Sequence, residues 1–132
     1  MAITKIWAVK DDLNRVLKYI KNPDKTKEEM SDGLKEVLTY TTQGYKTNEK
    51  EYITGINCDP KTALSQMMNT KLSYNKMDGR LAFHAVQSFK PGELTPDECH
   101  KLGVQLAKQM WGNRFEVVVS THLDKEHLHN HF

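Results

Sequence analysis

The feature that most constrains this chain is a cluster of histidines at its C-terminal end. Four of the six histidines, at positions 122, 127, 129 and 131, fall within the last eleven residues. Residues 114–122 are largely apolar and β-branched, and a short polar turn separates them from a second extended segment at 128–132. A parallel connection needs about a dozen residues or more, so the two segments must pair as an antiparallel hairpin.

Alternate residues of a strand share one face of the sheet. His129 and His131 therefore point to the same side, and His122 lies on the more polar side of the preceding strand. Folding back at the turn brings these three imidazoles together, which is typical of a catalytic site for a divalent metal. The alternative is a solvated turn that carries surface histidines.

Other polar side chains lie near this predicted site. We expect His127, which is nearer the turn, to be either a bystander or a support for the ligands rather than a ligand itself. Asp124 and Glu126 are expected to orient an imidazole or hold a metal-bound water. His84 and Ser88 share the more polar face of an expected strand at 80–89. They could support the metal site or contact a DNA phosphate. The alternative is that their polar groups are hydrogen-bonded within the sheet and have no such role.

The remaining sequence alternates extended and helical patterns. Strands are expected at 2–9 and 51–58, and helices at 13–20, after Asp59-Pro60, and after Thr95, which opens a capping box. We expect an α+β fold: a mainly antiparallel sheet with helices packed on one face, an open second face, and an incomplete final strand. The 132 residues form one domain, 1–132, in which the lysine-rich stretch 21–50 is expected to be a mobile or inserted segment.

Charge, cysteine content and hydropathy limit the classes of partner and the cellular location that we expect for this protein. The 19 Lys+Arg against 17 Asp+Glu give a net charge of +2, which neither requires nor excludes a nucleic-acid partner. Cys58 and Cys99 lie far apart and do not look like a disulfide framework. No signal peptide and no apolar run of roughly 20 residues is present, so we expect a cytoplasmic domain without membrane insertion.

Three stretches, in order, resemble motifs of one family. The segment from His122 to His131 resembles the His-hydrophobe-His signature of the relaxases, the nicking enzymes of conjugative plasmids and transposons. The other two resemble the N-terminal tyrosine motif and the middle motif of the mobilisation-protein branch: Leu17-Lys-Tyr19-Ile-Lys-Asn22-Pro23-Asp-Lys25-Thr26 and Phe83-His84-Ala-Val-Gln-Ser88-Phe89-Lys-Pro91-Gly92-Glu93. Because relaxase domains continue past the point matched by Phe132, the resemblance implies a C-terminally truncated nuclease domain.

The resemblance implies a chemistry for these residues. Tyr19 would attack the scissile phosphate to give a 5′-phosphotyrosyl enzyme and a free 3′-hydroxyl, while His122, His129 and His131 would hold Mg²⁺ or Mn²⁺. A phenol with a pKa of about 10 is a weak nucleophile, so it needs an activated phosphate opposite it. Tyr19 lies about 110° from the centre of its helix's apolar stripe, which suits such an attack. The alternative is a boundary tyrosine that covers the core.

The resemblance also implies partners. These are single-stranded DNA at an origin of transfer, accessory relaxosome proteins and a coupling protein, with no small-molecule substrate. Ser88, Lys21 and Lys25 are candidate DNA contacts, although a solvated lysine-rich surface explains the lysines equally well. Two other functions stay open: a replication initiator or transposase with the same chemistry, and a noncatalytic module that binds metal or single-stranded DNA.

Overall fold

The computed structural model describes residues 2–10, 34–35, 37–42, 52–76, 79–123 and 127–132. The helix expected at 13–20 lies outside these residues, as does most of the expected inserted segment 21–50. Within the described part, residues 34–35 and 37–41 are helical. These helical residues belong to the stretch 21–50 that was expected to be mobile or inserted.

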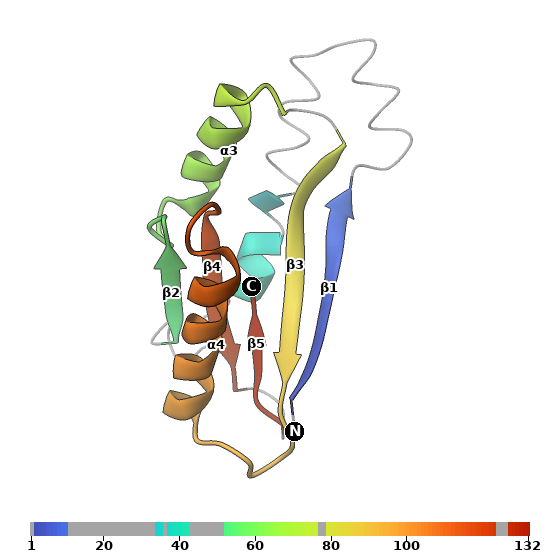
Figure 1. The fold of residues 1–132 in the computed structure, drawn as a ribbon, viewed down its shortest axis with the longest axis vertical. Helices are drawn as coiled ribbons and strands as arrows, with labels where there is room; N and C mark the ends of the chain where they lie inside the picture. Colours follow the sequence, from blue (N-terminus) through green and yellow to red (C-terminus); the bar gives the residue numbers. More distant parts are fainter. Residues whose placement is uncertain (1, 11–33, 36, 43–51, 77–78, 124–126) are drawn as a thin grey trace.

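The centre of the molecule is a five-stranded sheet in which every neighbouring pair is antiparallel (Figure 1). The strand order is β1-β3-β5-β4-β2, so the last strand of the chain occupies the middle of the sheet. The strands are β1 (Ile3–Lys10), β2 (Ile53–Ile56), β3 (Arg80–Ser88), β4 (Val117–His122) and β5 (His129–His131). The α+β fold with an antiparallel sheet is confirmed.

Helix α4 (Pro96–Trp111) packs along one face of the sheet, in front of β4 and β5 (Figure 1). Its start is the predicted capping box: Thr95 accepts from the backbone N–H of Glu98, and the Glu98 side chain accepts from the Thr95 N–H. Cys99, Gly103 and Ala107 recur every fourth residue and are the buried positions of the helix.

The apolar core lies between α4 and the strands β2 and β4. It is formed by Ile56, Ala107, Val117 and Val119, and Val104, Trp111 and Phe132 pack against it. Both cysteines are free, as the sequence predicted. Burial raises the pKa of Cys99 to about 11, so this thiol is held in its neutral form.

Several element boundaries differ from the predicted ones, and a local hydrogen bond explains two of these differences. Helix α3 (Ala63–Ser73) begins after Thr62 rather than at Pro60, because Asp59 accepts the Lys61 N–H in a preceding turn. Strand β4 begins at Val117 rather than at residue 114, because the N–H groups of Arg114 and Phe115 donate back to Trp111 at the end of α4.

Strand β2 also ends earlier than predicted. Asn57 adopts a positive φ of 59°, a left-handed conformation that Asn tolerates better than most residues. Its Nδ2 donates to the carbonyls of Gly112 and Phe115, at 2.7 and 2.9 Å. The turn that ends β2 is thereby tied to the segment between α4 and β4.

The C-terminal hairpin forms as predicted. His122 faces His129 across the β4–β5 pair, and Ser120 faces His131. Phe132 continues the pairing beyond β5, because its N–H and C=O both bond to the backbone of Ala85, at 2.9 and 3.0 Å. Among the helices described here, none is long and apolar enough to cross a membrane.

Candidate active site

The imidazoles of His122, His129 and His131 converge on one face of the sheet. His129 pairs with His122 on one side and with Ser88 on the other, and cross-strand partners share a face. The residues that alternate with them, Thr121 and Asn130, point to the opposite face and bond to α4 residues. The three histidines therefore lie on the face away from α4.

These three rings are buried and close to one another. Their exposures are 0 %, 7 % and 5 % for His122, His129 and His131. One ring nitrogen from each lies within 4.8 Å of the others. The ring centroids are 4.1 Å apart for His122 and His131, and 5.0 Å apart for both pairs that include His129.

Hydrogen bonds to backbone carbonyls indicate which ring nitrogen carries the proton in His122 and in His129. Nε2 of His122 lies 2.8 Å from the carbonyl oxygen of Thr41, which can only accept, so Nε2 carries the proton and Nδ1 the lone pair. In His129 the two nitrogens are exchanged. Nδ1 faces the carbonyl oxygen of His127 at 3.4 Å, which favours a proton on Nδ1 and a lone pair on Nε2.

The third ring is held by another histidine. Nδ1 of His131 lies 2.8 Å from Nε2 of His84, which is buried in β3 and whose ring also contacts Trp7 at 4.7 Å between centroids. Burial lowers the pKa of His84, and the neighbouring His122 lowers it further, so a neutral His84 can accept the proton of His131. Nε2 of His131 then presents its lone pair.

This donor set fits a divalent cation. Three buried imidazole nitrogens within 4.8 Å of one another match the number and type of protein ligands at a catalytic divalent-metal site. Ser120 shares this face, and its buried Oγ has no hydrogen-bond partner among the described residues. Imidazole ligands favour ions such as Mn²⁺ over Mg²⁺.

A tyrosine that the sequence analysis did not single out stands against the cluster. The Tyr40 ring lies 5.9 Å from His122 and 5.8 Å from His131 between centroids, and 44 % of the residue is exposed. It belongs to the helical segment whose Thr41 carbonyl bonds to His122. A signal was present in the sequence, because the spacing around Tyr40 repeats that around Tyr19.

The other predicted site residues fall into three groups. His84 bonds to the cluster, and half-buried Ser88 lies beside His129 on the same face. His127 is exposed at the turn, with its ring centroid 5.7 Å from that of His129. The remaining five lie outside the described residues: Tyr19, Lys21, Lys25, Asp124 and Glu126.

A second polar network, also missed from the sequence, lies on the α4 face directly behind the histidines. Thr121 donates to Oδ1 of buried Asn130 at 2.5 Å, so it accepts from Nδ1 of His100 at 2.9 Å. Nε2 of His100 then accepts from Thr54 at 2.7 Å.

The amide of Asn130 completes this network. Its Nδ2 donates to the carbonyl of Cys99 in α4 and to Gln87 in β3, at 2.9 and 3.1 Å. The network therefore links β4 and β5, the strands that carry the histidines, to β2, β3 and α4. These bonds restrain the backbone from which the imidazoles project.

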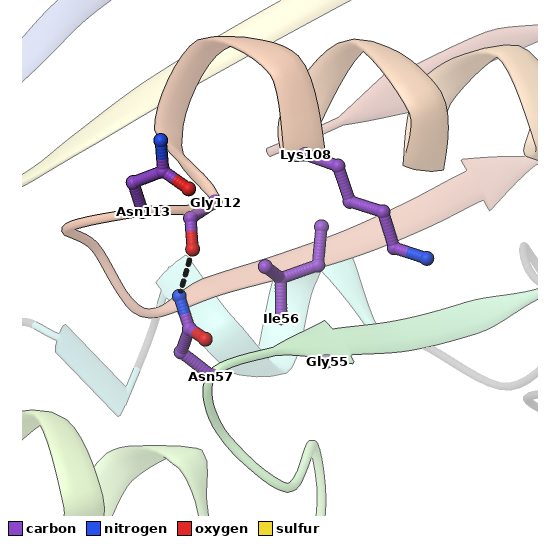
Figure 2. A pocket seen from close by; sticks show the side chains of 6 residues that line it. All are labelled: Gly55, Ile56, Asn57, Lys108, Gly112 and Asn113. Carbon is purple, nitrogen blue, oxygen red and sulfur yellow. Dashed lines mark hydrogen bonds between the residues drawn. The ribbon is translucent and has the colours of Figure 1, made fainter.

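A surface pocket of about 380 Å³ lies elsewhere (Figure 2). It is lined by Gly55, Ile56, Asn57, Lys108, Gly112 and Asn113, where β2 and α4 end. Ile56 pairs with Val117 at the start of β4, whereas His122 is the last residue of that strand. The pocket is therefore separate from the histidine cluster.

Comparison with known proteins assigns the family. Residues 19–132 match the family described as "Relaxase: MobA/VirD2-like, nuclease domain". A protein named rlx from Staphylococcus aureus is 45 % identical over 87 residues, covering 66 % of this chain and 27 % of its own length. The group II intron-interrupted relaxase LtrB of Lactococcus lactis subsp. cremoris is 33 % identical over 128 residues, covering 92 % of this chain and 22 % of its own length.

The fold, the histidine cluster and these matches together define a relaxase nuclease domain. The chain belongs to the MobA/VirD2-like relaxase family. It spans about a quarter of the length of the curated relatives it matches. No solved structure matches it.

Proposed function

We propose that this chain nicks one strand of DNA at an origin of transfer by tyrosine transesterification, in support of conjugative mobilisation. The observation that carries the proposal is the convergence of three buried imidazoles from β4 and β5 on the face away from α4. The matched relaxase family and the relative named relaxase LtrB favour this function over a replication initiator or a transposase.

In this proposal His122, His129 and His131 hold a divalent cation, Mn²⁺ or Mg²⁺. When bound, the cation polarises the nonbridging oxygens of the scissile phosphate and fixes its position. His84 accepts the proton of His131 Nδ1, and the Thr41 carbonyl accepts that of His122 Nε2, so both rings are oriented before DNA arrives.

Tyr19 is the proposed nucleophile. Its phenolic oxygen forms a bond to phosphorus as the bond to the 3′ oxygen breaks, which leaves a 3′-hydroxyl and a 5′-phosphotyrosyl enzyme. We propose that Ser88, which pairs with His129, contacts the DNA, and that Asp124 and Glu126 help to orient the imidazoles, with His127 as a bystander or a minor support at the turn. We further propose that Lys21 and Lys25 contact the DNA backbone, and that the protein acts in the cytoplasm with accessory relaxosome proteins and a coupling protein.

The test is covalent trapping. Native protein is incubated with Mn²⁺ and a random-sequence pool of single-stranded DNA labelled with fluorescein at the 3′ end, and then run on a denaturing gel. A labelled band at the protein's position is expected with Mn²⁺, and it is expected to disappear with EDTA or in the His131→Ala variant. A native protein that binds the pool but forms no adduct would identify a noncatalytic binding module.

A further inference from the structure

Part of the tyrosine motif recurs in this sequence, without the Asn22-Pro23 pair. Val16, Leu17, Tyr19, Lys25 and Thr26 recur 21 positions later as Val37, Leu38, Tyr40, Lys46 and Thr47. The two 11-residue segments thus share five identical residues at one constant offset, and Asn22 is replaced by another amide, Gln43. Tyr40 therefore occupies the same place in the second copy as Tyr19 does in the first.

The structure places the second copy's tyrosine at the histidine cluster. The Tyr40 ring lies edge-on to His122 and His131, at interplanar angles of 72° and 87°. Its helical segment is anchored on both sides of the ring: Leu34 is 2 % exposed, and Thr41 is 6 % exposed and bonds to His122. The Tyr40 ring thus lies next to two of the three imidazoles that would hold the cation and its phosphate.

Accessibility separates this tyrosine from one that only fills the core. The residue is 44 % exposed although both rings it contacts are buried, so one side faces the cluster and the other faces solvent. An incoming DNA strand can therefore reach Tyr40 from the solvent side, next to the cluster.

We propose that Tyr40 is a second tyrosine nucleophile of the histidine site, acting on the same phosphodiester class as Tyr19. Its phenolic oxygen forms a bond to phosphorus, the bond from phosphorus to the 3′ oxygen breaks, and the phenolic proton ends on that leaving oxygen. The products are a 5′-phosphotyrosyl linkage at Tyr40 and a free 3′-hydroxyl. This inference rests on the proposed function, and it adds a second attacking group to it.

The experiment identifies the tyrosine that carries the DNA. Native chain, Tyr19→Phe, Tyr40→Phe and the double variant are incubated with Mn²⁺ and the 3′-labelled random pool. Adducts are digested with nuclease and trypsin, and tandem mass spectrometry locates the phosphoryl group. Tyr74→Phe is the control, because Tyr74 is 74 % exposed and lies at the end of α3.

We expect a phosphotyrosyl group on Tyr40 in native protein and an adduct that persists in Tyr19→Phe. We also expect at least about tenfold less adduct in the double variant than in native protein. The inference is overturned if native protein carries the phosphoryl group on Tyr19 alone, or if Tyr40→Phe lowers the yield and no Tyr40 peptide is ever modified. Absence of any adduct from native protein would overturn the proposed function itself.

Discussion

Nε2 of His84 lies 2.8 Å from Nδ1 of His131, so a side chain of β3 sets the orientation of a ring on β5. The two residues are 47 positions apart in the sequence, and both are buried. Because the ring of His131 is held through one nitrogen, the direction of the other is fixed. His84 therefore acts on the candidate metal site through His131.

Removing His84 is expected to weaken metal binding. The His84→Ala variant should bind Mn²⁺ roughly 10–100-fold more weakly than native protein, because His131 loses the acceptor for its Nδ1 proton. Titration calorimetry measures the affinity, and circular dichroism checks that the apo variant is folded. His84→Gln, which keeps an acceptor, should recover part of the loss.

The control for this prediction is Trp7→Phe, which alters the other ring against His84. It should leave the Mn²⁺ affinity close to native. A folded His84→Ala variant that binds Mn²⁺ as tightly as native protein would contradict the role of this hydrogen bond.

His129 and His127 should differ sharply in their contribution to the affinity for Mn²⁺. His129→Ala removes one of the three clustered nitrogens, whereas His127→Ala removes an exposed ring at the turn. We expect a loss of Mn²⁺ affinity of at least about tenfold for the first variant and little change for the second. Equal losses in calorimetry would show that the choice of His129 over His127 is wrong.

A glycine in α4 makes room for the network behind the histidines. A Cβ on Gly103 would lie 2.6 Å from Nδ2 and 2.7 Å from Cγ of Asn130, which is fully buried and hydrogen-bonded on several sides. Helix propensity alone favours Gly103→Ala by about 1 kcal/mol. Overpacking costs about 1–3 kcal/mol and should win, because the Asn130 amide cannot move without breaking its bonds.

Urea unfolding tests this balance. Gly103→Ala should lower the free energy of unfolding, while Gln105→Ala, at an exposed position of the same helix, should not. The Gly103→Ala variant should also bind Mn²⁺ more weakly, since Asn130 lies between His129 and His131. An increase in stability would mean that the amide relaxes freely.

The stability of the network should depend on pH through His100. Burial lowers the pKa of this imidazole below 6.5, and nearby Asp97 offsets only part of the effect. The folded state therefore binds fewer protons at His100 than the unfolded chain does. Its stabilising contribution is complete above about pH 6.5 and is lost as the pH falls from there through the folded-state pKa.

The measurement is the free energy of unfolding of native protein and His100→Gln between pH 8 and pH 5. Native stability should fall more steeply below about pH 6.5 than that of the variant, which has no imidazole at this position. Parallel curves would show that His100 does not contribute to the pH dependence.

Patterns among residues close together in the sequence were sufficient to predict the C-terminal hairpin and the start of α4. The alternation of residues along two short strands correctly placed His122, His129 and His131 on one face, and the Thr95 capping box correctly placed the start of α4. Both patterns involve residues close together in the sequence, where strand parity and helix caps decide the structure.

Long-range contacts could not be predicted in the same way. The bond from His122 to Thr41 spans 81 residues, and the adjacent Tyr40 contacts the same ring. The chain from Thr54 through His100 and Thr121 to Asn130 likewise joins separate elements through polar side chains. No periodicity marks such residues, because each is a single polar position whose partner is set by tertiary packing.

Whether the three clustered imidazoles bind one divalent cation can be measured by diffraction from Mn²⁺-soaked crystals near the manganese absorption edge. We expect a single anomalous peak about 2.0–2.3 Å from one ring nitrogen each of His122, His129 and His131. A map with no peak there, or with manganese bound at His127 and neighbouring carboxylates instead, would contradict it.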